Sequence, residues 1–595
     1  MLKAIPFLIA LVTVLAFSPA FWNDFVSWDD EQNLLDNPHY RGLGWGQLRW
    51  MLTTNLLGHW IPLTWLSFGL DYLLWGMNPV GYHLTNLLLH AANGAVFYFV
   101  ALRLLRLAMP GPGELALRLG AGAAAAFFAL HPLRAESVAW VTERRDVLAG
   151  FFFLLTLLTY LKASEPQGAR RQRLLAASLG SYALALLAKS IVMTLPFVLI
   201  VLDFYPLRRL GTEPREWITP PARKVWVEKL PYLLLGLAGA GIALYAVNPG
   251  LTSLEKYPLS ARMAMALYSV WFYVRRTFVP LGLSPMYELP VEVNPLEPRF
   301  VESAIAVLIL SAGLWALRSR WPGALAIWVS YGVILAPVSG LVHNGHQLVA
   351  DRYSYLSGLG WALLVGAGTC AVIGARASGT VAPWIARLAA GAAAVSALSL
   401  GGLTWQQVQV WRDGQTLWVH AAELDPTCRI CQNNVGTILL TLERPDLAIE
   451  RFRRALTLNP GYLKAHGNLG VALLRAGRPA EAVEHLRRVL ADRPDEAYIR
   501  THLALALLQT GRPAEAVEHF RRVLARNPAD ADTLNHLGIA LIQLGELKDG
   551  IEHLRQAIRL DPSHVEALTN LGLALTAVGN PAEAVEHLRR AGLGR

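Results

Sequence analysis

The stretch KAHGNLGVALLRAGRPAEAVEHLRRVLADRP, residues 464–494, contains one complete helix–turn–helix unit of a repeat. Leu469 and Gly470 let the two helices approach closely, Ala482 packs from the second helix, and Pro494 closes the unit. Proline recurs at the same point every 34 residues, at positions 426, 460, 494, 528 and 562. This is the period of the tetratricopeptide repeat.

The repeats predict an all-α solenoid over residues 429–595, with five units of which the last is truncated. Stacked units of this kind bury a continuous core and leave a concave groove for an extended ligand. We expect one polar column in that groove to bind an acceptor protein, because Asn and His side chains can hydrogen-bond any peptide backbone. The alternative is that these residues cap or bridge neighbouring helices. The column consists of Asn434, Asn468, His502, His536 and Asn570.

The chain before the repeats has the composition of a membrane protein. The whole sequence is 54% hydrophobic and only 16% charged, which is too apolar for a typical soluble enzyme. Apolar runs of spanning length, about 17–25 residues, stop near Trp405. We therefore expect a helical transmembrane domain over residues 1–405, a linker over 406–428, and the repeats from 429. About eleven spans of this length start near Ile5, His83, Leu119, Val147, Leu174, Ile191, Leu230, Val301, Trp321, Ser354 and Pro383.

Lys and Arg residues predict the orientation, because short cytoplasmic loops retain positive charge. Most cations between the apolar runs fall on one side if the N-terminus is cytoplasmic and the first apolar segment is an uncleaved span. Residues 61–76 and 261–282 must then lie at the interface or re-enter, since they carry Asp71 and the pair Arg275–Arg276. The net charge of +10 comes from scattered cations, so we expect no nucleic-acid partner.

Cysteine is scarce, with three residues in the chain. Cys428 and Cys431 form a single CxxC motif without a second ligand pair nearby, which disfavours a zinc site. A disulfide or two free thiols are the remaining interpretations.

Polar residues gather in the loops that this orientation places outside the cytoplasm. FWNDFVSWDDEQNLLDNPHY, residues 21–40, carries the pair Asp29–Asp30, and RAESVAWVTERRD, residues 134–146, mixes acids with arginines. Solvated loops and structural ion pairs account for many such clusters. The same mixture suits group transfer from an anionic lipid, because a carboxylate can take the proton of the acceptor and cations can hold the leaving phosphate.

The chain as a whole resembles the transmembrane and tetratricopeptide repeat-containing protein O-mannosyltransferases, which are GT-C-type glycosyltransferases. The resemblance is carried by FVSWDDEQN (25–33), PLTWLSFGLDYLLWGMNPVGYHLTNLLLH (62–90), HPLRAESVAWVTERRDVLAG (131–150), AKSIVMTLPFVLIVLDFYPL (188–207), ADRYSYLS (350–357) and the repeats. It implies a polyprenyl-phosphate-linked sugar, typically mannose, as donor and Ser or Thr hydroxyls as acceptors. Three departures from the animal members imply altered donor contacts: WIPL (60–63) in place of a stretch that carries an arginine, Ser190, and Ser357.

The resemblance places the acidic motif of the first extracytoplasmic loop at Asp29 and Asp30, which we expect to be catalytic in an inverting transfer. We expect Arg144, Lys189 and Arg352 to bind the donor phosphate. Supporting roles are expected for His131, Glu136, Asp146 and Asp351. No cofactor is required by this mechanism, although the Asp pair could hold a divalent metal.

Two other functions fit the same sequence. The protein could transfer sugar to a lipid or a surface polysaccharide, or it could be a membrane-anchored tetratricopeptide scaffold without catalysis. A transporter fits less well, since no pair of broken helices recurs in two similar halves. The Ala-, Arg- and Pro-rich composition suggests a prokaryotic plasma membrane, with the repeats and the site outside the cytoplasm.

Overall fold

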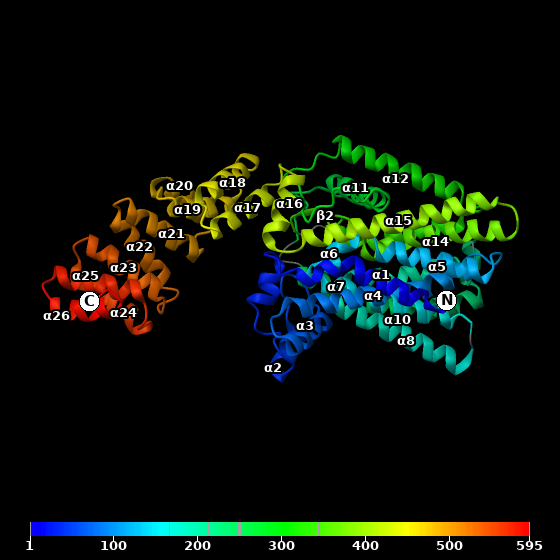
Figure 1. Ribbon diagram of the computed structural model, residues 1–595, viewed down its shortest axis with the longest axis horizontal. Helices are drawn as coiled ribbons and strands as arrows, with labels where there is room; N and C mark the ends of the chain where they lie inside the picture. Colours follow the sequence, from blue (N-terminus) through cyan, green and yellow to red (C-terminus); the bar gives the residue numbers. More distant parts are fainter. Residues whose placement is uncertain (1, 166, 212, 248–250, 343–344, 594–595) are drawn as a thin grey trace. The chain divides into compact units, whose positions relative to one another are not determined.

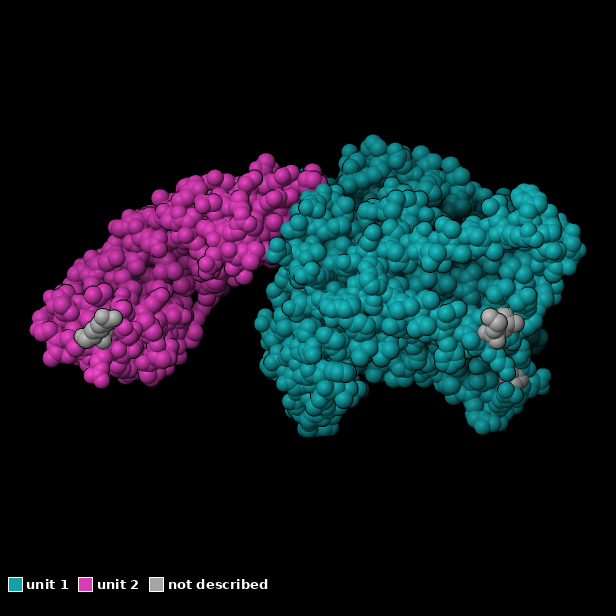
Figure 2. Space-filling view, in the orientation of Figure 1, with its two compact units in different colours: residues 1–424 teal, residues 425–595 magenta. Residues whose placement is uncertain are grey.

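The computed structural model describes residues 2–593 except 166, 212, 248–250 and 343–344. The chain forms two compact units, Met1–Leu424 and Asp425–Arg595 (Figure 2). The boundary falls inside the stretch 406–428 that the sequence predicts as a linker. Most of that stretch is helical and belongs to the first unit, because Trp411 and Trp418 are buried in it.

The first unit is a bundle of helices (Figure 1). Its α-helices are α1 Ile5–Phe17, α2 Trp45–Thr53, α3 Pro62–Trp75, α4 Pro79–Ala108, α5 Glu114–Ala129, α6 Ala135–Ala139, α7 Arg144–Ala163, α8 Gly168–Ala188, α9 Leu195–Phe204, α10 Pro220–Val247, α11 Leu259–Phe278, α12 Pro298–Ala316, α13 Pro322–Leu335, α14 Ser354–Ala377, α15 Pro383–Val410 and α16 Gly414–Leu424. The described strands are β1 Tyr287–Glu288 and β2 Gln347–Val349, which pair antiparallel.

Seven helical segments among the described residues are long and apolar enough to cross a membrane, or eight if the bent pair Glu114–Ala129 and Pro132–Ala139 counts as one span. The predicted spans near Ile191 and Trp321 form shorter apolar helices, Ser190–Phe204 and Pro322–Val338. The one near Leu174 is α8, whose first turns carry Arg170, Arg171 and Arg173. Helices α3 and α11, which we expected not to span, are outside the set.

Small residues bring the central helices together. A Cβ atom on Gly120 of α5 would lie 2.7 Å from the carbonyl oxygen of Gly366 in α14, so glycine is required at this crossing. Close backbone approach through small residues is the usual way that helices associate in a bilayer. Helix α4 packs against α1, α5 and α7 in the same bundle. This frame fixes the ends of α7, α8 and α14, where the polar loops lie.

The second unit is the predicted solenoid of paired helices. Its described helices are α17 Arg429–Thr441, α18 Pro445–Leu458, α19 Leu463–Arg475, α20 Pro479–Asp492, α21 Ala497–Gln509, α22 Pro513–Leu524, α23 Ala531–Gln543, α24 Leu547–Leu560, α25 Val565–Ala577 and α26 Pro581–Arg590. A Cβ atom on Gly470 would come within 2.5 Å of the Leu486 side chain, and Ala482 is fully buried. These contacts confirm the predicted close packing.

Candidate active site

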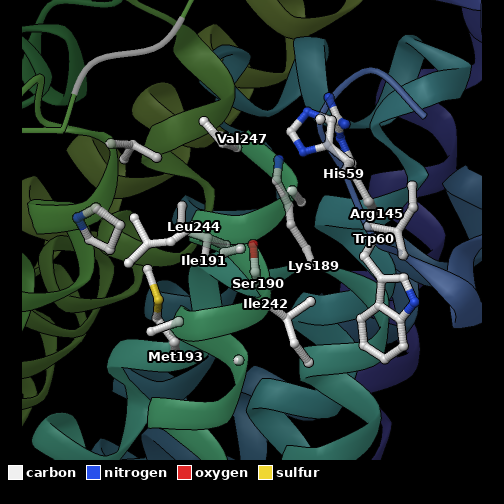
Figure 3. Close-up of a pocket in the computed structure, with 18 of the residues that line it drawn as sticks. His59, Trp60, Arg145, Lys189, Ser190, Ile191, Met193, Ile242, Leu244 and Val247 are labelled. Carbon is white, nitrogen blue, oxygen red and sulfur yellow. The ribbon is translucent and has the colours of Figure 1, made fainter. Parts of the chain in front are cut away.

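The first unit contains a cavity of about 650 Å³ with a polar end and an apolar wall. Asp29, His59, Arg145, Lys189 and Arg352 line the polar end. Helices α8 and α10 and the 3-10 helix η6, Ser190–Thr194, supply the apolar wall, with residues such as Leu186, Met193, Ile242 and Leu244. Figure 3 shows the Lys189 ammonium on the side of His59 and Arg145, with Met193, Leu244 and Ile242 on the other side.

The predicted acid pair is divided by the structure. Asp30 is 1% exposed; one carboxylate oxygen accepts hydrogen bonds from Thr142 N (3.0 Å) and Thr142 Oγ1 (2.5 Å), and the other accepts one from Val26 N (3.1 Å). Asp29 instead lines the cavity. Adjacent residues of a helical turn point about 100° apart, so only one of the two can face the cavity. Asp30, which we expected to be catalytic, therefore lies outside the cavity lining.

Burial raises the pKa of the Asp29 carboxyl above its usual range, although the positive charges of Arg145 and Arg352 oppose this shift. Burial also raises the pKa of Asp30 to about 7, against the hydrogen bonds from Thr142 and Val26. His59 shows the opposite effect, because burial and the cations Arg145 and Lys189 hold the pKa of its imidazole well below 6.5. A neutral His59 and a carboxyl of raised basicity thus share the polar end of the cavity.

Three cations at this end are held by buried acids. Glu143 accepts hydrogen bonds from Arg145 Nη2 (2.5 Å) and Lys189 Nζ (2.9 Å), and its carboxylate lies 3.2 Å from Arg352 Nε. Asp146 accepts a second bond from Lys189, at 2.7 Å, and Glu136 pairs with Arg352. Because Glu143 contacts all three cations, their charged groups are preorganised around its carboxylate.

Arg144 lies elsewhere. We expected it at the donor phosphate, but it is fully buried, ion-paired with Asp71, and donates to Asn86 Oδ1 (2.7 Å) and the Tyr82 carbonyl (2.8 Å). Its neighbour Arg145 lines the cavity instead. Arg144 and Arg145 start α7, so the helical turn directs them to different sides. The sequence, which presents two consecutive arginines, could not distinguish them.

The other predicted site residues support the polar end or lie apart from it. Lys189 and Arg352, which we expected at the donor phosphate, line the cavity. Asp146 forms an ion pair with Lys189, and Glu136 forms one with Arg352. Asp351 is buried and accepts a hydrogen bond from Tyr287 at 3.1 Å. His131 uses both ring nitrogens internally: Nε2 lies 2.9 Å from the Thr277 carbonyl oxygen and Nδ1 accepts from Leu133 N.

Sequence reasoning missed His59 entirely and did not single out Arg145 or Glu143. His59 follows a turn with positive φ at Leu57 and Gly58, and nothing in its local sequence connects it to Asp29. Glu143 and Arg145 stand in the motif that the sequence indicates, but their roles depend on which helical face meets Lys189. The feature of the sequence that indicated Glu143 and Arg145 was their position in a charged motif between two predicted spans.

The acidic loop is held in place by the end of α15 and the segment that follows it. Asn23 Nδ2 donates to the Val408 carbonyl (3.1 Å), Asp24 N donates to the Arg412 carbonyl (2.7 Å), and Trp418 Nε1 donates to the Ser27 carbonyl (3.1 Å). Trp28 stacks on Trp140, with ring centroids 4.8 Å apart, and also contacts Trp411 and Trp418. The residues just before Asp29 are therefore clamped by residues 408–418.

The surroundings of the acid pair bear on whether it could hold a divalent metal. Within the described part of the chain, no group of three His, Cys, Asp or Glu residues is arranged to hold an ion. Asp30 also has both of its oxygens engaged by Thr142 and Val26.

In the repeats, part of the polar column bridges neighbouring helices. Asn468 Nδ2 donates to Asn433 Oδ1 (3.0 Å), and Asn570 Nδ2 donates to Asn535 Oδ1 (2.9 Å). Asn434 accepts a bond from Asn433. His502 Nδ1 lies 2.8 Å from the Tyr498 carbonyl oxygen, and His536 stacks on Phe520. All five residues are half-buried. Cys428 and Cys431, at the start of the unit, form a disulfide.

Comparison with known proteins identifies the relatives of this chain. It is 25% identical to protein O-mannosyl-transferase Tmtc3 of Drosophila melanogaster over 459 residues, and 22% identical to TMTC3 of Homo sapiens over 507 residues, which is 78% of this chain. Its relatives are protein O-mannosyl-transferases. Identity rises to 41% with Tmtc1 of Drosophila melanogaster, over 103 residues. The chain spans about half the length of the TMTC3 proteins, 49% and 52%, and 11% of Tmtc1.

The repeats are confirmed independently. A family model described as tetratricopeptide repeat matches residues 435–497, 469–531, 501–561 and 535–594. Among solved structures, the chain is similar to the MamA RS-1 ArsTM double mutant (24% identity, TM-score 0.26, 28% of this chain and 92% of that one). It is also similar to YrrB, a TPR protein with an unusual peptide-binding site (21% identity, TM-score 0.26, 29% and 90%).

Two of the three departures from the animal members lie at the cavity. Trp60 and Ile61 of the WIPL stretch line it, and so does Ser190. Ser357 is buried in α14 and donates to the Tyr353 carbonyl.

Proposed function

We propose that the protein is an integral membrane glycosyltransferase that moves a sugar from a polyprenyl-phosphate donor to Ser or Thr hydroxyls of extracytoplasmic proteins. Mannose is the expected sugar, in line with the names of the relatives. The observation that carries the proposal is the division of one cavity into a carboxylate-and-cation end and an apolar wall. A donor with a charged phosphate and a long hydrocarbon tail has the same division.

In the proposed reaction, the Asp29 carboxylate takes the proton of the acceptor hydroxyl. The hydroxyl oxygen then attacks the anomeric carbon from the face opposite the phosphate, and the bond between that carbon and the phosphate oxygen breaks. The sugar is transferred with inversion, and the lipid phosphate leaves with the bonding electrons. Burial raises the pKa of Asp29, which makes its carboxylate a better base than a solvated aspartate.

Arg145, Lys189 and Arg352 neutralise the charge that develops on the phosphate. Fixed cations in a partly dry cavity stabilise such charge more strongly than solvated ones, since they need no reorganisation. Their acid partners Glu143, Glu136 and Asp146 keep them in place when the cavity is empty. The neutral His59 imidazole is within the same polar end and can hydrogen-bond a sugar hydroxyl or the phosphate.

The apolar wall would receive the polyprenyl chain. Helix α10 contributes Leu235, Ala238, Ile242 and Leu244, and α8 contributes Ala183, Leu186 and Leu187. The repeats would present the protein acceptor through their groove. His502 hydrogen-bonds within its own helix, and His536 stacks on Phe520 of the preceding repeat, so neither side chain forms the Asn–Asn bridge seen elsewhere in the column.

The test is a transfer assay on the full-length protein in lipid, with radiolabelled polyprenyl-phosphate-mannose and a Ser/Thr-rich protein mixture. Label should enter protein with the wild type and not with Asp29→Asn. A parallel donor, polyprenyl-phosphate-glucose, tests the sugar, and a lipid acceptor tests the alternative product. Failure of every donor to transfer would favour a scaffold without catalysis.

A further inference from the structure

A second cluster of ionisable residues lies at the other ends of the helices that form the cavity wall. It surrounds a pocket of about 690 Å³ lined by Arg171 and Leu175 of α8, by Arg209, and by the first two turns of α10. From Glu228 in this pocket to Val247 in the first cavity, α10 is about 28 Å long at 1.5 Å per residue. That length matches the hydrocarbon core of a bilayer, about 30 Å.

The pocket is cationic. Arg171, Arg209 and Lys224 line it, against the single carboxylate of Glu228. Arg209 is fixed by Glu228 (2.7 Å) and Asp203 (3.0 Å), and Arg171 also pairs with Glu228. Lys224 takes part in none of the ion pairs formed among described residues. The Arg209 guanidinium, which is held by two acids, and the Lys224 ammonium therefore line the same pocket.

A buried network of polar residues holds Arg209. Lys229 and Asp203 are both 0% exposed and form an ion pair of 2.5 Å. Tyr160 donates to Asp203 at 2.8 Å, and Arg209 donates to the Tyr160 hydroxyl at 2.9 Å. This buried network is remote from the reaction proposed above, so catalysis does not account for it. It holds Arg209 in one orientation at the mouth of the pocket.

An exposed apolar stripe continues from the pocket along α10. Val227, Leu230, Leu234 and Leu237 are 70%, 53%, 58% and 69% exposed. A cationic pocket followed by lipid-facing hydrocarbon surface is suited to a molecule with an anionic phosphate head and acyl chains, and basic pockets between helices bind such lipids in other membrane proteins.

We propose that this pocket, defined by Arg171, Arg209, Lys224 and Glu228, binds the phosphate head group of an anionic phospholipid. The acyl chains lie along the stripe Val227–Leu230–Leu234–Leu237. The lipid belongs to the bilayer leaflet opposite the sugar-transfer cavity, and it is bound as a structural ligand that is not consumed. The proposal does not depend on the transferase activity.

Native mass spectrometry of the full-length protein tests the proposal, with phosphatidylglycerol or phosphatidylcholine added in mixed micelles. We expect the wild type to retain phosphatidylglycerol in preference to phosphatidylcholine. The double variant Arg171→Gln/Lys224→Gln should bind it more weakly, by about fivefold for each cation removed. The matched control is Arg318→Gln/Arg320→Gln, which removes two exposed cations outside the pocket and should retain the lipid.

Thermal unfolding distinguishes binding of a whole lipid from binding of free phosphate. It also detects a variant that fails to bind lipid because it is poorly folded. Phosphatidylglycerol should raise the melting temperature of the wild type and of the control variant, and this increase should disappear in the double variant. Equal increases in all three proteins, or preference for phosphatidylcholine, would overturn the proposal. An equal increase with inorganic phosphate alone would also overturn it, by showing that the acyl stripe contributes nothing. The single variant Lys224→Gln, which breaks no observed ion pair, provides the comparison if the double variant is unstable.

Discussion

The carboxylate of Asp30 accepts two hydrogen bonds from Thr142, one from its backbone N–H at 3.0 Å and one from its hydroxyl. Thr142 directly precedes Glu143, which fixes all three cations of the cavity. These two hydrogen bonds therefore connect the acidic loop to the cationic motif, while Asp29 lines the cavity. Two adjacent acids thus differ in their surroundings: Asp30 is hydrogen-bonded to Thr142, and Asp29 lines the cavity.

Asp29→Asn should abolish transfer while the protein folds normally. The amide cannot take a proton, and the loss of a general base typically costs 10²–10⁴-fold in rate. The measurement is initial transfer rate together with thermal stability. Asp36→Asn, an exposed acid of the same loop, is the control and should keep wild-type rates. An active Asp29→Asn protein would remove Asp29 from the mechanism.

Asp30→Asn should change the pH dependence of stability. The folded-state pKa of Asp30, about 7, is above the usual aspartate value of 3.8. The stabilisation linked to its proton is therefore complete below about pH 4 and is lost as the pH rises through about 7. Relative to Asp30→Asn, the wild type should lose up to about 1.4 kcal/mol of unfolding free energy per pH unit across this window. Melting curves of both proteins from pH 4 to 8 check this. Parallel curves would contradict the assigned shift.

Lys189→Met should destabilise the fold by about 3–5 kcal/mol, because Glu143 and Asp146 would lose a cation while remaining buried. The double variant Lys189→Met/Asp146→Asn should recover part of that stability but not donor binding. The KM for the polyprenyl-phosphate donor, measured beside the melting temperature, distinguishes the two effects. Recovery of the wild-type donor KM in the double variant would show that Lys189 has only a structural role.

Gly414→Ala should displace the acidic loop. A Cβ atom at residue 414 would lie 1.9 Å from Ser27 Oγ, and such overpacking typically costs about 1–3 kcal/mol. We expect a lower kcat with a smaller change in donor KM. Gly391→Ala, whose Cβ would have no neighbour within 4 Å, is the matched control. The second-site change Ser27→Gly should restore part of the activity; no effect of Gly414→Ala would mean that the clamp does not position Asp29.

His502→Ala/His536→Ala should raise the KM for a protein acceptor several-fold without changing the KM for the donor. These side chains are half-buried members of the column and can hydrogen-bond an extended backbone. The control is His485→Ala/His519→Ala, which alters second helices of the repeats. An equal effect of both double variants would indicate general loosening of the repeats instead of a peptide site.

The sequence by itself determined the repeats and the apolar first unit. A 34-residue period and the packing of Gly470 and Ala482 are local properties, because each repeat contacts only its neighbours. The polar loops around Asp29, Arg145, Lys189 and Arg352 were also recognisable, because their mixture of acids and cations suits group transfer from an anionic lipid.

Only the tertiary structure decided which of these polar residues share a cavity. Asp29 and Asp30, like Arg144 and Arg145, are adjacent in the chain. Which member of each pair lines the cavity depends on how its helical turn is oriented against the neighbouring segments. His59 and Lys189 come together across 130 residues of sequence, through the packing of α3 and α8. Trp418 and Ser27 are also distant in the sequence and are joined by a hydrogen bond. Only the packing of the bundle brings two such segments together.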